Sequence, residues 1–243
     1  MRNENSECAA DCVLYNAKVI TLDLLQASAD FLAIKGNNII GVGRRGELDQ
    51  FKKRDTKRID CEGGAVIPAF NDAHCHPLSL GATMVYVDCS KDAVRDIDDI
   101  KEQIRKRAEK TEPGKWIRVA NYDEVDFSDR RAPNRWELDE AALENPVILI
   151  HRYGQPCFLN SMALQIAGFD RQTKDSSTGT IHRESETKML NGMISGRNEQ
   201  VERTIPSLDD NELEEGMKSA NNAYLSFGIK SLQDMSWTNG LYH

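Results

Sequence analysis

Apolar and polar residues alternate over short stretches in the first quarter of the chain, with turn-forming residues between the stretches. Alternation with a period of two is typical of half-buried β-strands. The pattern predicts a small β-sandwich over residues 1–64, with a hairpin turn at Lys35-Gly36-Asn37-Asn38. Its five expected strands lie at residues 12–15, 18–22, 31–34, 39–42 and 58–61.

From residue 65 onward, short apolar runs alternate with stretches of helical periodicity, which is typical of α/β proteins with a parallel sheet. Three convincing βα units are expected around Val66, Val147 and Ile229, with a further strand near Trp116. A polar insertion is expected at about residues 91–206. The expected helices lie at residues 94–110, 136–143 and 160–167, with a long helix that begins at Ser207-Leu208-Asp209-Asp210.

Composition narrows the class of protein. The chain has 243 residues, of which 40% are hydrophobic and 29% charged, so it can bury one sizeable core or two small ones. The net charge of -8 argues against nucleic acid and anionic membranes as partners, because both select basic surfaces. Six cysteines without a C-x-x-C pair, and no apolar segment after the polar start, favour a reducing, cytoplasmic setting.

Two histidines one residue apart end an apolar stretch at residues 65–77. Residues i and i+2 of a strand share a face, so His74 and His76 point together, whereas Cys75 points into the core. Asp72 is placed to orient a ligand histidine. Two adjacent imidazoles supply half of a site for zinc or a similar divalent ion; the alternative is a pair of solvated side chains.

This stretch resembles the P-G-F-x-D-x-H-x-H signature of the amidohydrolase superfamily, and later segments resemble its YtcJ-like branch, amidohydrolase family 3. The resemblance implies a metal-dependent hydrolase built on a (β/α)8 TIM-like barrel beside a small β-sandwich. A complete barrel takes about 250 residues, so residues 65–243 are expected to form an incomplete one. The matching segments are I-P-A-F-N-D-A-H-C-H-P, Tyr122-Asp123-Glu124, Arg135-Trp136-Glu137-Leu138-Asp139-Glu140, Asn145-Pro146-Val147-Ile148-Leu149, Asn160-Ser161-Met162-Ala163-Leu164 and Gly228-Ile229-Lys230-Ser231-Leu232-Gln233-Asp234.

The chain departs from the family pattern at two positions. Gln155 stands where the family has a histidine, and Gly196 falls where a block ends in a glutamate that serves the metal site. Glu199 could substitute for that glutamate, although an exposed charge is the preferred interpretation. The family's later ligands, two histidines and an aspartate, have no counterparts, since neither His182 nor His243 occupies such a position.

Other candidate site residues follow predicted strands. Arg152, after the strand near Val147, is a candidate to bind a substrate anion or carbonyl through its guanidinium group. Asp234 is a second substrate-binding candidate, and an aspartate that caps the next turn is the equal alternative. His151 is expected to be a core or rim residue. Four carboxylates form either an acid/base or metal cluster or, preferably, a solvated loop; they are Asp123, Glu124, Asp126 and Asp129.

The segment Gly41-Val42-Gly43-Arg44-Arg45-Gly46 matches G-x-G-x-x-G after a strand, as in dinucleotide-binding loops. The helical stretch that follows, at residues 47–53, is too short for the crossover of a βαβ unit. Asp60 and Glu62 also come too early for the acidic residue that binds the ribose. A glycine-rich exit from a hairpin is therefore the preferred interpretation.

Two functions from different classes remain. The first is a metal-dependent hydrolase of amide or other nonpeptide carbon–nitrogen bonds, with a small-molecule substrate and no assigned catalytic base. The second is a noncatalytic association module that requires a second chain or another copy of itself to cover the open sheet.

Overall fold

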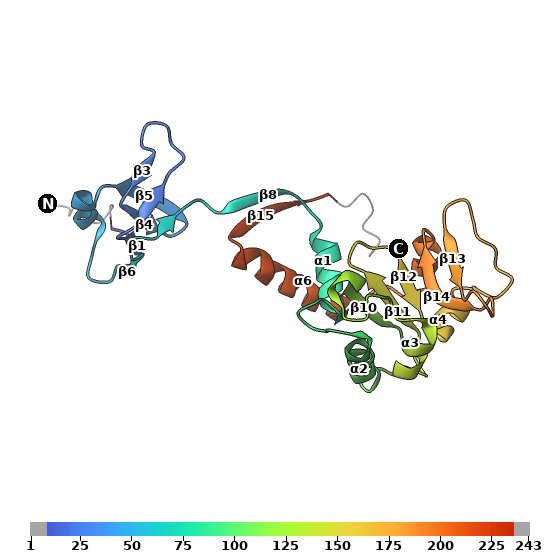
Figure 1. Ribbon diagram of the computed structural model, residues 1–243. Helices are drawn as coiled ribbons and strands as arrows, with labels where there is room; N and C mark the ends of the chain where they lie inside the picture. The colour runs from blue at the N-terminus through green and yellow to red at the C-terminus, as the bar shows by residue number, and fades with distance from the viewer. Residues whose placement is uncertain (1–8, 236–243) are drawn as a thin grey trace. The chain divides into compact units, whose positions relative to one another are not determined.

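The computed structural model describes residues 9–235, apart from the side chains of Asn198 and Glu199, so the alternative carboxylate Glu199 and the terminal His243 lie outside this account. The chain divides into two compact units (Figure 1). The N-terminal unit comprises Met1–Asn71 and Gly228–Lys230, and the larger unit comprises Asp72–Phe227 and Ser231–His243.

The N-terminal unit contains two small sheets, of strand order β5-β4-β1-β6 and β3-β2-β7. Val13, Phe31, Ala33 and Leu48 form its buried centre, which explains the alternation along β1 and β4. The strands are β1 (Cys12–Tyr15), β2 (Lys18–Ile20), β3 (Ser28–Ala29), β4 (Phe31–Lys35), β5 (Asn38–Gly43), β6 (Lys57–Asp60) and β7 (Ala65–Val66), and the short 3-10 helix η2 spans Arg45–Phe51.

The glycine-rich segment is not a nucleotide loop. Within residues 9–235 its strand, β5, pairs only with β4, in the antiparallel direction, at the edge of the sheet, and a 3-10 helix follows it. The two strand glycines leave room for side chains of that helix, because a Cβ on Gly41 would lie 2.3 Å from the Phe51 ring and one on Gly43 would lie 2.2 Å from the Glu47 carboxylate. The hairpin interpretation of this segment is the one that the structure supports.

The larger unit is built on a six-stranded mixed sheet of order β13-β14-β12-β11-β10-β9. The three strands β9, β10 and β11 run parallel, and β12, β14 and β13 continue the sheet in antiparallel pairs. The strands are β9 (Val87–Asp88), β10 (Ile117–Tyr122), β11 (Val147–His151), β12 (Cys157–Leu159), β13 (Thr180–Arg183) and β14 (Leu190–Ser195). A mixed α/β fold, as predicted, is therefore present.

Helices cover both faces of this sheet. Val147 and Leu149 of β11 face one core with α2 and α3, whereas Ile148 belongs to a second core with α4. Burial on both faces explains why β11 is a continuous apolar run. The helices are α1 (Pro77–Met84), α2 (Ile97–Ala108), α3 (Arg135–Ala141), α4 (Ser161–Ile166), α5 (Asn198–Glu202) and α6 (Asp210–Ser226), with the 3-10 turn η3 (Glu124–Asp126).

Residues 91–206, expected as a polar insertion, contain most of this sheet and most of its two cores. The hairpin of β13 and β14 contributes Ile181, Leu190 and Ile194 to the second core, and Met193 of β14 packs against the first core. The other residues of the hairpin are mostly polar, which is why the sequence pattern indicated a turn-rich segment. This range is thus part of the packed domain.

His74 lies on β8 (Phe70–Cys75), which pairs with β15 (Ile229–Asp234) in a two-stranded ladder, and His76 directly follows the strand as the N-cap residue of α1. The expected strand from residue 65 is broken, because Pro68 has no N–H to donate and restricts the residue before it. Val66 instead pairs with Val19 of β2 in the N-terminal unit. Helices α1 and α6, which follow β8 and precede β15, pack side by side (Figure 1).

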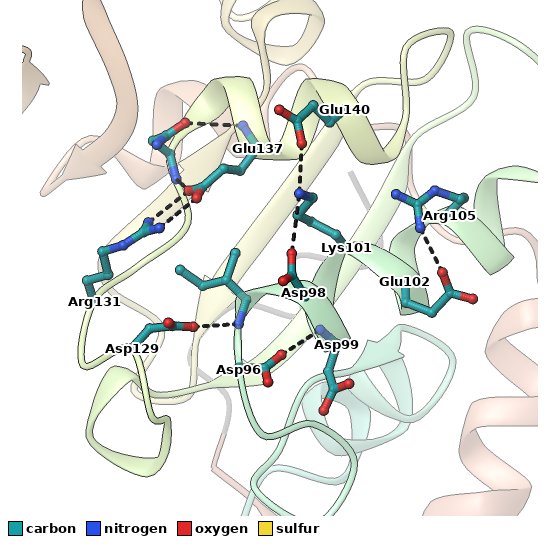
Figure 2. A network of polar contacts seen from close by, with 12 residues as sticks. Asp96, Asp98, Asp99, Lys101, Glu102, Arg105, Asp129, Arg131, Glu137 and Glu140 are labelled. Carbon is teal, nitrogen blue, oxygen red and sulfur yellow. Dashed lines mark hydrogen bonds and ion pairs between the residues drawn. The ribbon is translucent and has the colours of Figure 1, made fainter.

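Charged side chains link α2 to α3 and to the segment that precedes α3 (Figure 2). Arg131 binds the Glu137 carboxylate through two bonds of 2.7 and 2.9 Å, and the Asn134 backbone N–H donates to the same carboxylate at 2.8 Å. The hydrogen bond from Arg131 is the main cause that lowers the pKa of Glu137 below its ordinary value of 4.5.

A carboxyl whose pKa is lowered on folding stabilises the protein above its unfolded-state pKa, and this contribution is lost as the pH falls through the folded-state value. We therefore expect Glu137→Gln to reduce the free energy of unfolding at pH 7, and the difference from wild type to shrink below pH 4.5. Urea unfolding at several pH values measures this. The matched control is Glu140→Gln, because the carboxylate of Glu140 is 63% exposed. An equal loss in the free energy of unfolding of this variant would contradict the prediction.

Five cysteines lie within the described residues, and all are free; Cys8 lies outside them. Burial raises the pKa of Cys89 and of Cys157 to about 12, so these thiols stay protonated at neutral pH. This agrees with their expected role as small buried hydrophobes. Within residues 9–235, no helix is both long and apolar enough to cross a membrane.

Candidate metal centre and strand-end residues

His74 and His76 lie at the end of β8 with both side chains exposed and Cys75 buried between them. Their ring centroids are 5.6 Å apart, with the planes at 80° to each other. The two rings are exposed on either side of a buried residue, with His74 in the strand and His76 one residue beyond it. Two neighbouring imidazoles on an exposed face are suited to bind one divalent ion together.

Backbone contacts hold this strand end in place. The Asp72 carboxylate accepts the backbone N–H of His74 at 3.0 Å, so it orients the main chain, not a ring nitrogen. The Cys75 thiol donates to the Gln233 carbonyl at 3.4 Å, and the Met235 N–H donates to the Cys75 carbonyl at 3.0 Å. The position of His74 and His76 is therefore tied to the end of β15.

Asp234, at the end of β15, is half-buried near Tyr224 of α6. Burial, a hydrogen bond with Cys75 and the nearby Asp72 and Asp234 carboxylates raise the pKa of Tyr224. Among residues 9–235, the structure does not bring a third donor atom into a group with both His74 and His76. The two histidines therefore form only part of a metal site.

A second group lies where β10 and β11 end. Tyr122 and His151 are paired in the parallel register, so Asp123, Glu124 and His151 follow at the same edge of the sheet. One ligand atom from each lies within 4.8 Å of the others. Asp123 is only 2% exposed, so the preferred interpretation of these carboxylates as a solvated loop does not hold for it. The register of the two parallel strands is the signal that could have indicated the group.

Hydrogen bonding favours a structural role for this second group. The Tyr153 backbone N–H donates to Nδ1 of His151 at 3.2 Å, which leaves the proton of the neutral ring on Nε2. Ligation of a metal through Nε2 would require this proton to leave and the contact of Nδ1 with Tyr153 to break. It lies 3.7 Å from the Asp123 carboxylate and 3.4 Å from that of Glu124, close enough for electrostatic attraction.

Arg152 is already occupied by protein groups. Its Nε lies 2.7 Å from Asp123, one terminal nitrogen lies 3.2 Å from Asp126, and the other donates to the Tyr153 hydroxyl at 2.9 Å. The side chain is 40% exposed, so a substrate would share the guanidinium with these partners. The geometry therefore gives less support than the sequence to Arg152 as a substrate-binding residue.

The two departures from the family pattern contact each other. The Gln155 side-chain oxygen accepts the backbone N–H of Gly196 at 3.2 Å. Gly196 has a φ of +73°, and a Cβ there would lie 2.2 Å from the Thr178 carbonyl oxygen. The backbone at residue 196 is therefore arranged for a glycine, and a glutamate there would require it to move.

Comparison with known proteins decides the family. Residues 57–242 match a family model whose description is "Amidohydrolase family". The chain belongs to the amidohydrolase family. It is 29% identical to the N-substituted formamide deformylase of Arthrobacter pascens, over 92% of this chain and 42% of that protein. It is 23% identical to the putative amidohydrolase YtcJ of Bacillus subtilis, over 79% and 34%.

Solved structures give the same class of fold. An uncharacterized metal-dependent hydrolase from Pyrococcus furiosus superposes with a TM-score of 0.62 and 22% identity, over 95% of this chain and 45% of that one. Its counterpart from Pyrococcus horikoshii gives 0.61 and 20%, over 95% and 44%. The chain spans less than half the length of these amidohydrolase relatives.

Proposed function

We propose that this chain forms the first part of a metal-dependent hydrolase that cleaves amide or other nonpeptide carbon–nitrogen bonds. The paired, exposed rings of His74 and His76 at the end of β8 are the observation that carries the proposal. Family membership and the metal-dependent hydrolase fold support it. In this proposal residues 1–64 form the N-terminal part of a composite sandwich domain, and residues 65–243 form part of a TIM-like barrel.

The donor set fits a divalent ion, with zinc favoured by imidazole ligands. His74 and His76 would hold it, while Asp72 and the backbone contacts of Cys75 keep the two rings at the strand end. A bound divalent ion supplies a water of lowered pKa and polarises the scissile carbonyl. Two imidazoles fill only half of a tetrahedral shell, so in this proposal the remaining ligands and the general base are water or groups that the structure does not describe.

Two residues are proposed to contact the substrate. Asp234 stays a candidate because it ends the strand that pairs with β8, and Arg152 is the weaker one because protein groups occupy its guanidinium.

The cysteine content and absence of disulfides among the described cysteines support placing the protein in the cytoplasm.

The proposal predicts that the protein, with the groups that complete the site, hydrolyses an N-substituted formamide, the class named for the Arthrobacter relative, in the presence of zinc. Activity should fall at least a hundredfold in the His74→Ala/His76→Ala variant, on the order of the loss expected when a metal is released. His182→Ala is the matched control, because its ring contacts Ser195 at 3.0 Å and lies outside the pair. Activity that survives in the double variant would refute the proposal.

A second candidate function is an association module that another chain completes. The observation that favours it is that β8 pairs only with β15 within the described residues, while Ile67 and Phe70 are 48% and 54% exposed. Open strand edges of this kind are normally covered. Analytical ultracentrifugation distinguishes the two candidates: a homodimer or a stable complex without hydrolase activity favours the module, and an active monomer excludes it.

A further inference from the structure

A cavity of about 680 Å³ lies within the larger unit, on the face of the sheet that carries Ile148 and Ile150. Its walls come from α1, β10, β11, the start of β12, α5 and residues 205–208. This volume is in the range of sites for small molecules. The lining does not include His74, His76 or the group at Asp123, so the cavity is separate from the residues considered above.

Aliphatic side chains form a continuous part of the cavity wall. Ile148 and Val201 are buried in the core, and Ile150 and Ile205 are partly buried against it. Ala82 contributes from α1 and Leu208 from the segment before α6. This part of the wall is suited to an apolar chain, and hydroxyl groups of Ser79, Thr83 and Ser207 also line the cavity.

One cation stands against this apolar wall. Arg118 of β10 is half-buried, donates to the Pro206 carbonyl, and places its guanidinium 5.8 Å from the centre of the Tyr86 ring. Among the described residues, no carboxylate lies within ion-pairing distance of it. A half-buried guanidinium without a counterion favours binding of an anion.

The other polar groups of the cavity define the charge it accepts. Burial raises the pKa of Tyr86, so its hydroxyl stays protonated and can donate a hydrogen bond. Glu202 and Arg203, both exposed, also line the cavity with opposite charges, and the Glu202 and Glu212 carboxylates lie close enough to act on Tyr86. Arg118 is the cation that stands against the apolar wall, and a single guanidinium suits a monoanion better than a polyanion.

We propose that this cavity binds a monocarboxylate with an apolar tail, with the carboxylate on Arg118 and the tail along Ile148 and Ile150. Neutral apolar molecules would leave the guanidinium without a counterion, and phosphate esters would carry more charge than one arginine offsets. The inference is independent of the hydrolase proposal, since it needs neither the metal nor the two histidines.

Isothermal titration of the purified protein with decanoate, and with decanol as the neutral analogue, tests the proposal. We expect decanoate to bind at least about tenfold more tightly than decanol, the gain of one charge-assisted hydrogen bond. Arg118→Gln should remove this difference and leave decanol binding unchanged, whereas Ile150→Trp should abolish binding of both ligands. Lys110→Gln, an exposed cation outside the cavity, should change nothing.

Ile205→Trp fills the cavity from its other wall, so a folding failure of one tryptophan variant leaves the test intact. Thermal unfolding identifies variants that fold. Absence of decanoate binding, equal binding of both ligands, or binding that persists in Arg118→Gln and in a folded tryptophan variant would overturn the proposal. One more result would overturn the proposal: a wild-type dimer that binds no decanoate and that dissociates in Ile150→Trp. It would show that a second copy of the chain fills the cavity.

Discussion

Asn160→Ala is expected to lower the free energy of unfolding by about 3–4 kcal/mol, because the variant leaves four buried backbone groups without partners. Asn160 is 1% exposed. Its Oδ1 accepts the N–H groups of Val147 and Ala163 at 3.0 and 2.9 Å. Its Nδ2 donates to the carbonyls of Ala142 and Asn145 at 3.2 and 2.9 Å.

Chemical denaturation monitored by circular dichroism measures this loss. The matched control is Asn222→Ala on an exposed face of α6, where we expect a change within about 0.5 kcal/mol. Asn160→Asp separates the two halves of the network, since it keeps the acceptors for Val147 and Ala163 but places a carboxylate beside two carbonyls. A loss below about 1 kcal/mol in Asn160→Ala would contradict the account of this network.

Gly216→Val is expected to destabilise the larger unit by about 3 kcal/mol, because it separates α1 from α6. A Cβ on Gly216 would lie 2.2 Å from the carbonyl oxygen of Gly81, which is backbone and cannot rotate away. In the opposite direction, a Cβ on Gly81 would lie 3.0 Å from the Met217 sulfur. The two helices thus touch at their glycines.

The control for this prediction is Gly46→Ala, because a Cβ at that position meets nothing within 4 Å. Thermal unfolding should show a large decrease in midpoint for Gly216→Val and little change for Gly46→Ala. Since α1 follows His76 and α6 precedes β15, we also expect weaker zinc binding in Gly216→Val. An unchanged midpoint would mean that the helices do not pack as closely as the structure shows.

Elements with a long, regular pattern could be predicted from the sequence. The strand at residues 12–15 has the bounds that the alternation indicated, and the strand expected around Ile229 is present at residues 229–234. Helix α2 was expected within two or three residues, because Asp96 caps its first turn and isoleucines repeat on one face. In these segments the local pattern and the tertiary packing agree.

The strands β12, β13 and β14 could not be predicted in this way. β12 has only three residues, too few for a period to be recognised, and the β13–β14 hairpin is mostly polar outside its core residues. The strand that leads to the histidines begins at Phe70 because of a proline, a break that hydrophobicity alone does not reveal. Short elements depend on partners that are distant in sequence.

The candidate site also has a part that could be predicted from the sequence and a part that could not. The histidine pair follows from the spacing of two residues at the end of one strand, so a local pattern was sufficient to find it. The burial of Asp123 depends on Arg152, a residue nearly thirty positions later, and the contact of Gln155 with Gly196 joins two separate segments. Such contacts depend on the register of the sheet, which no local pattern determines.

The central claim, that His74 and His76 bind a divalent ion, is tested most directly by elemental analysis of the purified protein after zinc loading and gel filtration. The account predicts zinc that is retained by the wild type and by His182→Ala, and is lost from His74→Ala/His76→Ala. Circular dichroism of the three proteins should be the same, because both rings are exposed. Absence of zinc from the wild type, or zinc that persists in the double variant, would contradict the claim.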